Sequence, residues 1–571
     1  MRKSGRGLPF AHAFGVLALG MAGALQSSTV SAFSFNLGGD IQGAFDTDVT
    51  YGYMRRMEDA QADTKAPSYG NRVLFNEKGD TLSNAIRISH TLELKRGDMG
   101  FLMRGNYFYD QAFKDKPLPW GVERLLEHGQ DITDLVFYGK PTENTTLRVG
   151  KQVINWGEST FIQGGLSDIN TFDIKKLRTP GADLKDAFIG ANAIDLSWSS
   201  ENWTVEGFAL FKFDRVRVDP MGSPFATLDA IGDGGGFDLG GDGRPGGGHP
   251  SNPSGLGCTA LDNPPPTAPN TPRCDLLGGR LARVNDRQPS GNGQWGIAVR
   301  KFLPEFFNGG EVAFYVQNLH DHLPMISGYG RSGQFFVDYP EDIKRYGVSF
   351  NTNVAGVAIG GEYSMRKDAP IQLLAPLVNS LGAALPPGAL PPGFNGVPDP
   401  ATVPGSYQQG WATSDRHQMQ FTVQKNWGVV HQLGADAGSS IVEVAFGRLS
   451  DLPASNVLFE PTLTKSWSGL QMRHSLTYQA ALFNLIALTP SFAYRWDTHG
   501  NSNELGGAKA FVDGRRAATF GLDFDYMGGR YKGGISYTSF HGRRSEKNLA
   551  NSLLNGAYDR DFLQANVSMS F

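Results

Sequence analysis

Short segments that alternate apolar and polar residues recur along the whole chain. Segment 518–526 alternates Ala, Leu and aromatic residues with Thr, Gly and Asp, and segment 562–571 alternates in the same way until the chain stops on Phe571. Successive side chains of a β-strand point to opposite faces, so a period of two gives a strand one apolar and one polar face. The pattern therefore predicts β-strands.

The alternation places about 18 strands along the chain, joined by connections that are alternately long and short. We expect the strands at about 34–56, 82–96, 99–112, 131–140, 144–156, 191–200, 202–214, 292–302, 309–320, 341–353, 354–366, 415–427, 436–448, 468–484, 487–497, 514–528, 529–541 and 558–571. Short connections such as 96–98 and 527–530 contain Gly or Asp, which tolerate the positive φ of tight hairpins. A count of 16 is the alternative, because the boundaries within 161–188 and 427–437 are poorly marked.

A closed barrel accounts for both the strands and the polarity of the chain. Beyond the N-terminal region, the sequence has no apolar run near the roughly 18 residues that a transmembrane helix needs. In a barrel only every second residue meets lipid, and closure pairs every backbone N–H and C=O group. We therefore predict an all-β fold, a large antiparallel transmembrane β-barrel of about 16–18 strands with short periplasmic turns and long extracellular loops. The alternative is a soluble, exported, β-rich protein.

Residues 1–32 have the layout of a cleaved signal peptide. A basic head precedes an apolar stretch over 14–25, and small residues at 30–32 suit cleavage. The apolar stretch is too short to span a bilayer. We therefore expect residues 33–571 to form the barrel, in the outer membrane of a Gram-negative bacterium.

The C-terminal strand resembles the closing strand by which bacterial outer-membrane barrels are recognised for insertion. This resemblance makes Val567, Met569 and Phe571 the expected membrane-insertion signal. It also makes the barrel-assembly machinery an expected partner, besides outer-membrane lipid and lipopolysaccharide.

Two long connections, 215–290 and 367–413, are rich in Gly and Pro and lack the periodicity of a packed core. We expect irregular loops or mobile lids there. The only two cysteines, Cys258 and Cys274, lie in the first connection. Export favours a disulfide between them over free thiols. Closing a loop of about 15 residues would stabilise the ordered form by roughly 3 kcal/mol.

Candidate metal ligands are few and weakly patterned. Asp233, Asp238 and Asp242 are separated by glycines and could wrap a calcium ion, but a flexible linker is the favoured interpretation of this single imperfect motif. Segment 320–322 reads His-Asp-His and could bind a metal through both imidazoles, although an exposed cluster at a loop end is favoured. We expect no metal and no other cofactor.

Familiar catalytic motifs are absent from the sequence. It contains neither Gly-x-Ser-x-Gly nor His-Glu-x-x-His, so the serine-hydrolase and zinc-protease interpretations have no anchor. His474 beside Ser475 could be half of a lipase site embedded in the barrel. Neighbouring strand residues face opposite sides, however, so these two cannot form a nucleophile–base pair. We expect that the protein is not an enzyme.

The connection after the fifth predicted strand mixes charged and apolar residues over 156–180. We predict that it folds into the barrel, anchored by Phe161, Ile169 and Phe172, and narrows the pore. The residues expected to form this constriction are Arg104, Arg148, Glu158, Asp168, Asp173, Lys175, Lys176 and Arg178. The alternative is an extracellular cap held by surface salt bridges, each worth about 0–1 kcal/mol.

Several segments of the sequence are characteristic of a known family. They are 45–47 (Phe-Asp-Thr), 51–52 (Tyr-Gly), 104–109 (Arg-Gly-Asn-Tyr-Phe-Tyr), 156–163 (Trp-Gly-Glu-Ser-Thr-Phe-Ile-Gln), 176–181 (Lys-Leu-Arg-Thr-Pro-Gly) and 219–220 (Asp-Pro). Through them the chain resembles, over about 33–571, the proteobacterial outer-membrane family known as domain of unknown function 1302. The resemblance implies a large outer-membrane barrel that moves lipidic or other hydrophobic compounds, with an inner-membrane exporter and a periplasmic carrier as partners. It carries over no substrate and no catalytic residue.

Charge does not identify a solute. Without Arg2, Lys3 and Arg6 of the signal peptide, the 52 basic residues fall to 49 against 56 acidic residues, a net charge of −7. Nucleic-acid binding is disfavoured, because phosphate recognition needs a concentrated basic stripe.

Width favours transport, since a ring of about 16–18 strands encloses an aqueous channel unless loops fill it. We therefore expect a porin-like channel or transport conduit for a small hydrophobic or aromatic molecule. The alternative is a structural or surface-interaction barrel with adhesive loops, and a hydrolase embedded in the barrel is a distant third.

Overall fold

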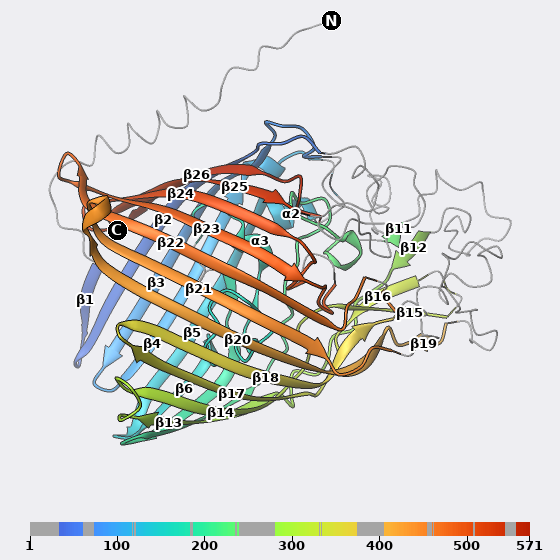
Figure 1. Ribbon diagram of the computed structural model, residues 1–571, viewed down its shortest axis with the longest axis horizontal. Helices are drawn as coiled ribbons and strands as arrows, with labels where there is room; N and C mark the ends of the chain where they lie inside the picture. The colour runs from blue at the N-terminus through green and yellow to red at the C-terminus, as the bar shows by residue number, and fades with distance from the viewer. Residues whose placement is uncertain are drawn as a thin grey trace, which may run out of the picture.

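The computed structural model shows a closed β-barrel with its longer connections gathered at one end, which we call the loop end (Figure 1). It describes residues 33–60, 74–116, 118, 122–182, 187–234, 237–238, 280–330, 332, 334–373, 405–453, 459–460, 462–505, 509–542 and 556–571. The predicted signal peptide, 1–32, and both cysteines lie outside these residues.

The barrel wall is an antiparallel ring of 18 strands. Its strands are β2 (Ile41–Arg56), β3 (Thr81–Arg96), β4 (Met99–Asp110), β5 (His128–Thr142), β6 (Thr145–Gln152), β9 (Ala191–Ser200), β10 (Trp203–Leu210), β13 (Trp295–Leu303), β14 (Gly310–Leu319), β17 (Ile343–Val354), β18 (Val357–Gln372), β20 (Trp411–Val430), β21 (Ala435–Leu449), β22 (Ser466–Leu482), β23 (Ile486–His499), β24 (Arg516–Tyr526), β25 (Tyr531–His541) and β26 (Phe562–Ser570). The predicted all-β fold with a large antiparallel barrel is confirmed, and 18 rather than 16 is the strand count.

The ring closes where β26 pairs with Asp48–Arg56 of β2. The first half of β2 pairs instead with β1 (Phe33–Gly38), so β1 and β26 share one edge of β2. Gly39 and Asp40 turn the chain between β1 and β2 with φ values of 58° and 65°. The predicted first strand, 34–56, was therefore wrong in one respect: it is two strands that form a hairpin.

The outer face of the wall is apolar and the lumen face is polar. Phe137, Phe314 and Phe520 are 64%, 63% and 58% exposed on the outside. Gln317, on the opposite face of β14 from Phe314, is buried, because chain segments inside the barrel cover it. An apolar exterior around a polar interior is the arrangement of a barrel that faces lipid. None of the helices among the described residues is long and apolar enough to cross a membrane.

Three of the long connections contribute strands to a second sheet at the loop end. Its five strands are β11 (Phe237–Asp238), β12 (Arg280–Arg283), β15 (Met325–Tyr329), β16 (Gln334–Asp338) and β19 (Tyr407–Gln408). The expectation of wholly irregular loops over 215–290 and 367–413 is therefore wrong in their described parts. The strands β11, β12 and β19 of these two connections have only two to four residues, too few to show alternation, and β12 and β19 pair with strands of a different connection.

The remaining elements are short and lie in connections. They are η3 (Gln111–Phe113), α2 (Val122–Glu127), β7 (Thr171–Phe172), α3 (Ile174–Leu177), β8 (Phe188–Ile189), η4 (Asp229–Ile231) and η6 (His431–Leu433). The poorly marked boundary near 427–437 is the hairpin of β20 and β21, in which η6 is followed by Gly434 with a left-handed φ of 64°.

Candidate functional site

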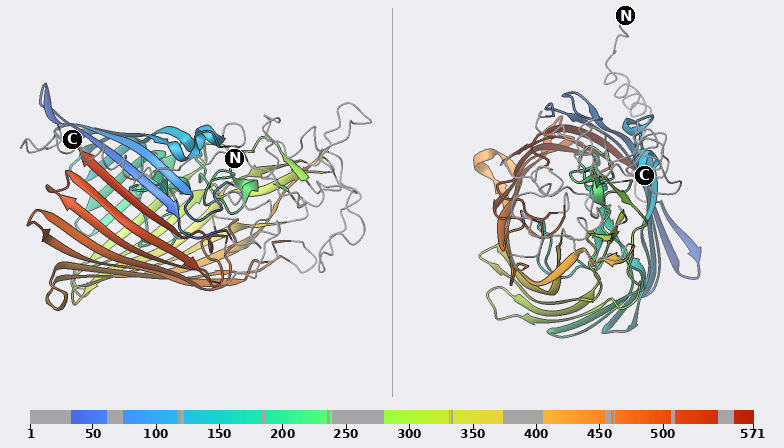
Figure 2. Two further views of the ribbon diagram at one scale, coloured as in Figure 1. Left: turned by 90° about the horizontal axis from the view of Figure 1, so that it is seen from above. Right: turned by 90° about the vertical axis from the view of Figure 1, so that its right-hand side faces the viewer.

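The connection between β6 and β9, residues 153–190, enters the barrel, and the view from the loop end shows chain inside the ring (Figure 2). Residues 183–186 fall outside the described part of the chain. We call 153–190 the crossing connection, because its first half contacts the wall of β14–β21 and its second half the wall of β2–β5. In the order of strands around the ring, these two walls lie opposite each other.

Glu443 of β21 holds the first half by accepting three consecutive backbone N–H groups. Its carboxylate oxygens lie 3.0 Å from the nitrogen of Thr160, 2.6 Å from that of Phe161 and 3.3 Å from that of Ile162. Glu443 is fully buried. A single wall carboxylate thus positions three residues of the crossing connection.

Glu362 of β18 makes a second attachment of the same kind. It accepts the N–H of Glu158 at 2.7 Å and the N–H of Leu166 at 3.0 Å. The connection approaches this carboxylate so closely that a Cβ atom at Gly157 or Gly165 would collide with it. The two glycines therefore allow the backbone to reach Glu362.

Trp156 anchors the start of the crossing connection in an apolar cluster. Its ring is 2% exposed and packs against Phe208 and Tyr315, with ring centroids 4.8 Å and 5.5 Å apart. The predicted anchor Ile169 lies in the same buried cluster. Phe161 packs instead on a cluster formed by residues of β18, β21, β22 and the β23–β24 connection. Trp156 was not among the predicted anchors, although it directly precedes Gly157, where the backbone comes close to Glu362.

The acidic residues of the first half each have a wall partner. Asp168 pairs with Arg366 of β18, and Arg345 of β17 donates to the backbone carbonyl of Asp168 at 3.3 Å. Burial opposes ionisation of Asp168, but these two guanidinium groups hold its pKa below the usual range. Glu158 accepts the side-chain amide of Asn351 at 2.9 Å, and burial raises the pKa of Glu158.

The second half of the crossing connection forms a charged cluster with β5. Lys176 lies 2.5 Å from Asp131, and Arg217 of the β10–β13 connection lies 2.9 Å from the same carboxylate. Asp173 caps α3 by accepting the N–H of Lys176 and lies 3.6 Å from Arg217. Lys175 donates to a backbone carbonyl of α2, and burial lowers its pKa. Each cation of this cluster is therefore held by wall or loop atoms.

The end of the crossing connection packs on β2 and β3. Arg178 pairs with Asp219 at 2.9 Å, and its guanidinium lies 4.8 Å from the centroid of the Phe225 ring. Arg87 of β3 donates to the backbone carbonyl of Gly181 at 2.7 Å. The chain therefore reaches the wall opposite Glu362 and Glu443.

The predicted constriction residues lie in separate places rather than in one ring. Arg104 pairs with Asp134 of β5 at 3.1 Å, and Arg148 lies opposite Asp195 in the pairing of β6 with β9. Glu158 and Asp168 contact the β14–β21 wall, whereas Asp173, Lys175, Lys176 and Arg178 belong to the second half. The positions of charged residues along the sequence of a connection do not show which wall of the barrel each residue contacts. Their role in a pore stays a prediction.

A cavity of about 340 Å³ lies between the crossing connection and the wall of β22–β26. Phe161 and Phe172 of the crossing connection, Phe540 of β25 and Phe562 of β26 contribute to its apolar lining. Its charged lining residues are Arg178, Arg495, Lys509 and Arg515. No carboxylate side chain of the described residues lines this cavity.

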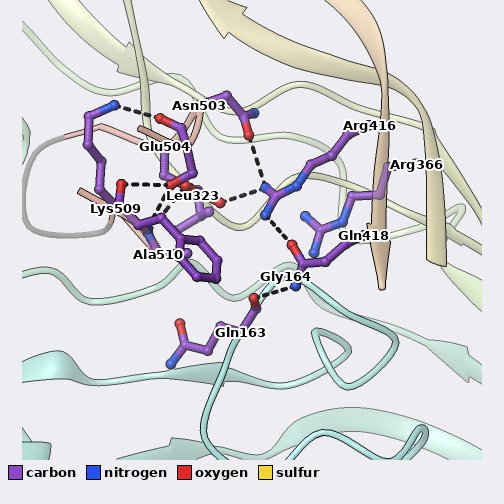
Figure 3. A network of polar contacts seen from close by, with 12 residues as sticks. Gln163, Gly164, Leu323, Arg366, Arg416, Gln418, Asn503, Glu504, Lys509 and Ala510 are labelled. Carbon is purple, nitrogen blue, oxygen red and sulfur yellow. Dashed lines mark hydrogen bonds and ion pairs between the residues drawn. The ribbon is translucent and has the colours of Figure 1, made fainter. Parts of the chain in front are cut away.

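A buried polar network joins the crossing connection to the β23–β24 connection (Figure 3). Arg416 of β20 donates to Asn503 at 3.0 Å, to Glu504 at 2.5 Å and to Gln418 at 2.8 Å. Gln418 in turn donates to the backbone carbonyl of Gln163 at 2.8 Å. Burial opposes the charge of Glu504, but Arg416 and further hydrogen bonds lower its pKa to about 2.

The His-Asp-His segment 320–322 is buried, so the expectation of an exposed cluster is wrong. His322 donates to the backbone carbonyl of Asp214 at 2.7 Å and stacks on Phe213, which accounts for its burial. His320 bonds the backbone carbonyl of Asn292 at 3.0 Å. Among the residues that the structure describes, no group of three His, Cys, Asp or Glu residues could hold a metal.

The structure describes the side chain of only one of the three calcium candidates, Asp233, Asp238 and Asp242. Asp233 pairs with Arg215 at 2.6 Å, whereas Asp242 and the side chain of Asp238 lie outside the description.

The remaining predicted positions lie in the wall. His474 bonds the Ser440 hydroxyl on β21 rather than Ser475. Phe571 pairs with Thr47 of β2 through two backbone hydrogen bonds, of 2.9 and 3.3 Å, while Val567 and Met569 pair with Tyr51 and Val49 of the same strand.

Sequence reasoning missed the two wall carboxylates that hold the crossing connection. Glu443 stands in the apolar run Ile-Val-Glu-Val-Ala-Phe, and Glu362 follows two glycines. A lone acid within an apolar strand was the available signal. It also missed Arg495 and Arg515 of the cavity, which no local motif distinguishes from other lumen arginines.

Comparison with known proteins gives a family and some solved structures. The family model that matches is described as "Protein of unknown function (DUF1302)" and covers residues 13–571. No curated protein matches the chain. Similar solved structures include OccAB4 of Acinetobacter baumannii, with a TM-score of 0.42 and 7% identity over 93% of this chain and 98% of that chain. OpdK of Pseudomonas aeruginosa, solved with vanillate, has a TM-score of 0.42 and 8% identity over 93% and 98%.

A BenF-like porin from Pseudomonas fluorescens Pf-5 is similar with a TM-score of 0.41 and 9% identity over 94% of this chain and 100% of that chain. At such identities and TM-scores, these likenesses do not indicate a substrate for this chain.

Proposed function

We propose that this chain, which belongs to the DUF1302 family of proteins of unknown function, is a porin-like channel in the outer membrane of a Gram-negative bacterium. The apolar outer face of its closed ring supports a place in lipid. A ring of this width has room for an aqueous path. The proposal is a channel rather than an enzyme.

The observation that carries the proposal is the crossing connection. It is attached to opposite walls through Glu362 and Glu443 on one side and Asp131 and Arg87 on the other. It narrows the lumen but leaves the cavity of about 340 Å³ beside β22–β26. A partly filled lumen with a defined narrow point is the arrangement by which a pore selects solutes.

The solute proposed from the lining is a small hydrophobic or aromatic molecule. Phenylalanines of the crossing connection and of the wall line the cavity together, and small-molecule sites are mostly apolar with a few placed polar groups. A barrel whose only role is surface interaction would not need such a space in its lumen.

Conductance in planar bilayers tests the channel. The unaltered protein should give single-channel currents. The double variant Glu362→Ala, Glu443→Ala removes acceptors for five backbone N–H groups, counting two for Glu362 and three for Glu443. The freed connection should raise the conductance at least about two-fold and increase current noise, because the narrow point is no longer fixed.

The matched control is Glu93→Ala. Glu93 contacts Lys95 and Tyr138 of the wall, and it makes no hydrogen bond or ion pair with the described part of the crossing connection. Its loss therefore removes one carboxylate without releasing the narrow point. Folded protein that carries no current in any of these forms would leave a surface-interaction role as the better account.

A further inference from the structure

Two arginines at the cavity share one carboxylate. The Nε atoms of Arg495 and Arg515 lie 3.0 Å and 2.7 Å from the two oxygens of Asp497. Asp497 is only 2% exposed and also accepts the N–H of Val512, whereas the side chains of Arg495 and Arg515 are 30% and 17% exposed and line the cavity. Two cationic side chains therefore line the cavity, whereas Asp497, the carboxylate that they share, is buried behind them.

Backbone carbonyl groups fix the orientation of both guanidinium groups. Arg515 donates through Nη2 to the carbonyls of Lys509 and Ala510 at 3.2 Å and 2.9 Å, and Arg495 donates through Nη2 to the carbonyl of Ala510. The Nη1 group of each makes no hydrogen bond within the described ranges of the chain. Planar groups held this way present unused donors in a fixed geometry, which suits a carboxylate.

A third arginine reaches the same cavity from the crossing connection. Arg178 is 31% exposed, while its partner Asp219 is 7% exposed. Burial and the positive charges of Arg495 and Arg178 lower the pKa of Arg515 to about 10, although Asp497 opposes this. The positive charges of Arg495 and Arg178 thus oppose that of Arg515, and an anion placed in the cavity would relieve this repulsion.

We infer that this cavity binds an organic anion with an apolar body, its carboxylate facing Arg495, Arg515 and Arg178 and its hydrocarbon part facing the phenylalanines. The inference rests on the proposed channel function, because it names the class of solute. A volume of about 340 Å³ lies at the lower end of the range of about 300–1,000 Å³ for small-molecule sites. It therefore suits a compact molecule such as an arylalkanoic acid.

Binding of phenylbutyrate to the purified full-length protein in detergent micelles tests the inference by calorimetry. Phenylbutyramide and phenylbutylamine have the same apolar body with a neutral and a cationic head. The carboxylate should bind at least about ten-fold more tightly than the amide, because hydrogen bonds between ions are stronger than those to a neutral group. The amine should bind more weakly than the amide.

Variants then locate the site. Arg495→Gln and Arg515→Gln should each weaken phenylbutyrate binding about ten-fold and leave phenylbutyramide binding nearly unchanged. Arg473→Gln is the matched control: Arg473 lies two residues from Gln471 on the same face of β22 but does not line the cavity. It should leave both affinities unchanged.

The outcomes separate this inference from the channel itself. Equal affinity for phenylbutyrate and phenylbutyramide in the unaltered protein overturns the anion site, even if a variant fails to fold. If the protein conducts but does not bind phenylbutyrate more tightly than phenylbutyramide, the anion site is overturned and the channel stands. If the protein does not conduct but binds phenylbutyrate in a way that depends on Arg495 and Arg515, the anion site stands and the channel is overturned.

Discussion

At the scale of single residues, the attachment of the crossing connection to the wall depends on glycines, which have no side chain, as much as on charged residues. Gly157 and Gly165 lie so close to Glu362 that either Cβ would occupy the space of its carboxylate. Gly157 also has a φ of 85°, which side chains with a Cβ rarely adopt. The attachment at Glu362 therefore requires glycine at both positions.

Gly165→Ala should detach this part of the crossing connection without harming the barrel. The new methyl group collides with the carboxylate of Glu362, so single-channel conductance should rise and become noisier. Gly207→Ala in β10 is the control, because a Cβ there would meet only ordinary contacts, the nearest at 3.5 Å. Conductance traces of Gly165→Ala that match those of the control would contradict the role assigned to Glu362.

The same residues show where prediction from sequence ends. Alternation placed Glu362 and Glu443 in strands, but it treats every lumen position alike. Their hydrogen bonds join residues 204 and 283 positions apart in the chain. Such pairings depend on how the barrel closes, and no local pattern contains that information.

At the scale of elements, the strands were predictable and the connections were not. A wall strand keeps one face in lipid and one in the lumen, so its sequence must alternate. The loop-end strands β11 and β19 are two residues long and carry no such signal. The crossing connection stood out by its mixed composition, but the division of its charges between two walls appears only in three dimensions.

The closing strand supports a prediction about assembly. Phe571 completes the pairing of β26 with β2 through its two backbone bonds to Thr47. Deleting Phe571 should lower the amount of folded, membrane-inserted protein several-fold, because both the last rung of the seam and the aromatic terminal residue are lost. Phe571→Tyr keeps both and should assemble normally. Quantifying the heat-modifiable folded form on gels measures the effect, and equal yields of the deletion and the unaltered protein would contradict it.

At the scale of the whole molecule, the apolar outer face predicts where the protein resides. Exposed side chains such as Phe137, Phe314 and Phe520 cover the outside of the ring, where water would be an unfavourable neighbour. The protein should stay in the membrane pellet after carbonate washing and should sediment with lipopolysaccharide-rich membranes in a density gradient. Recovery in the soluble periplasmic fraction would argue against this location.

The crossing connection also acts as a brace across the ring. The ring has 18 strands, and a chain attached at Glu443 on one side and at Arg87 on the other links two opposite walls of it. The cross-section of the barrel and the position of the arginines beside the cavity are therefore mechanically coupled. A thinner or more tightly packed bilayer that flattened the ring would shift Arg178 relative to Arg515, so the affinity of the proposed anion site would depend on the surrounding lipid.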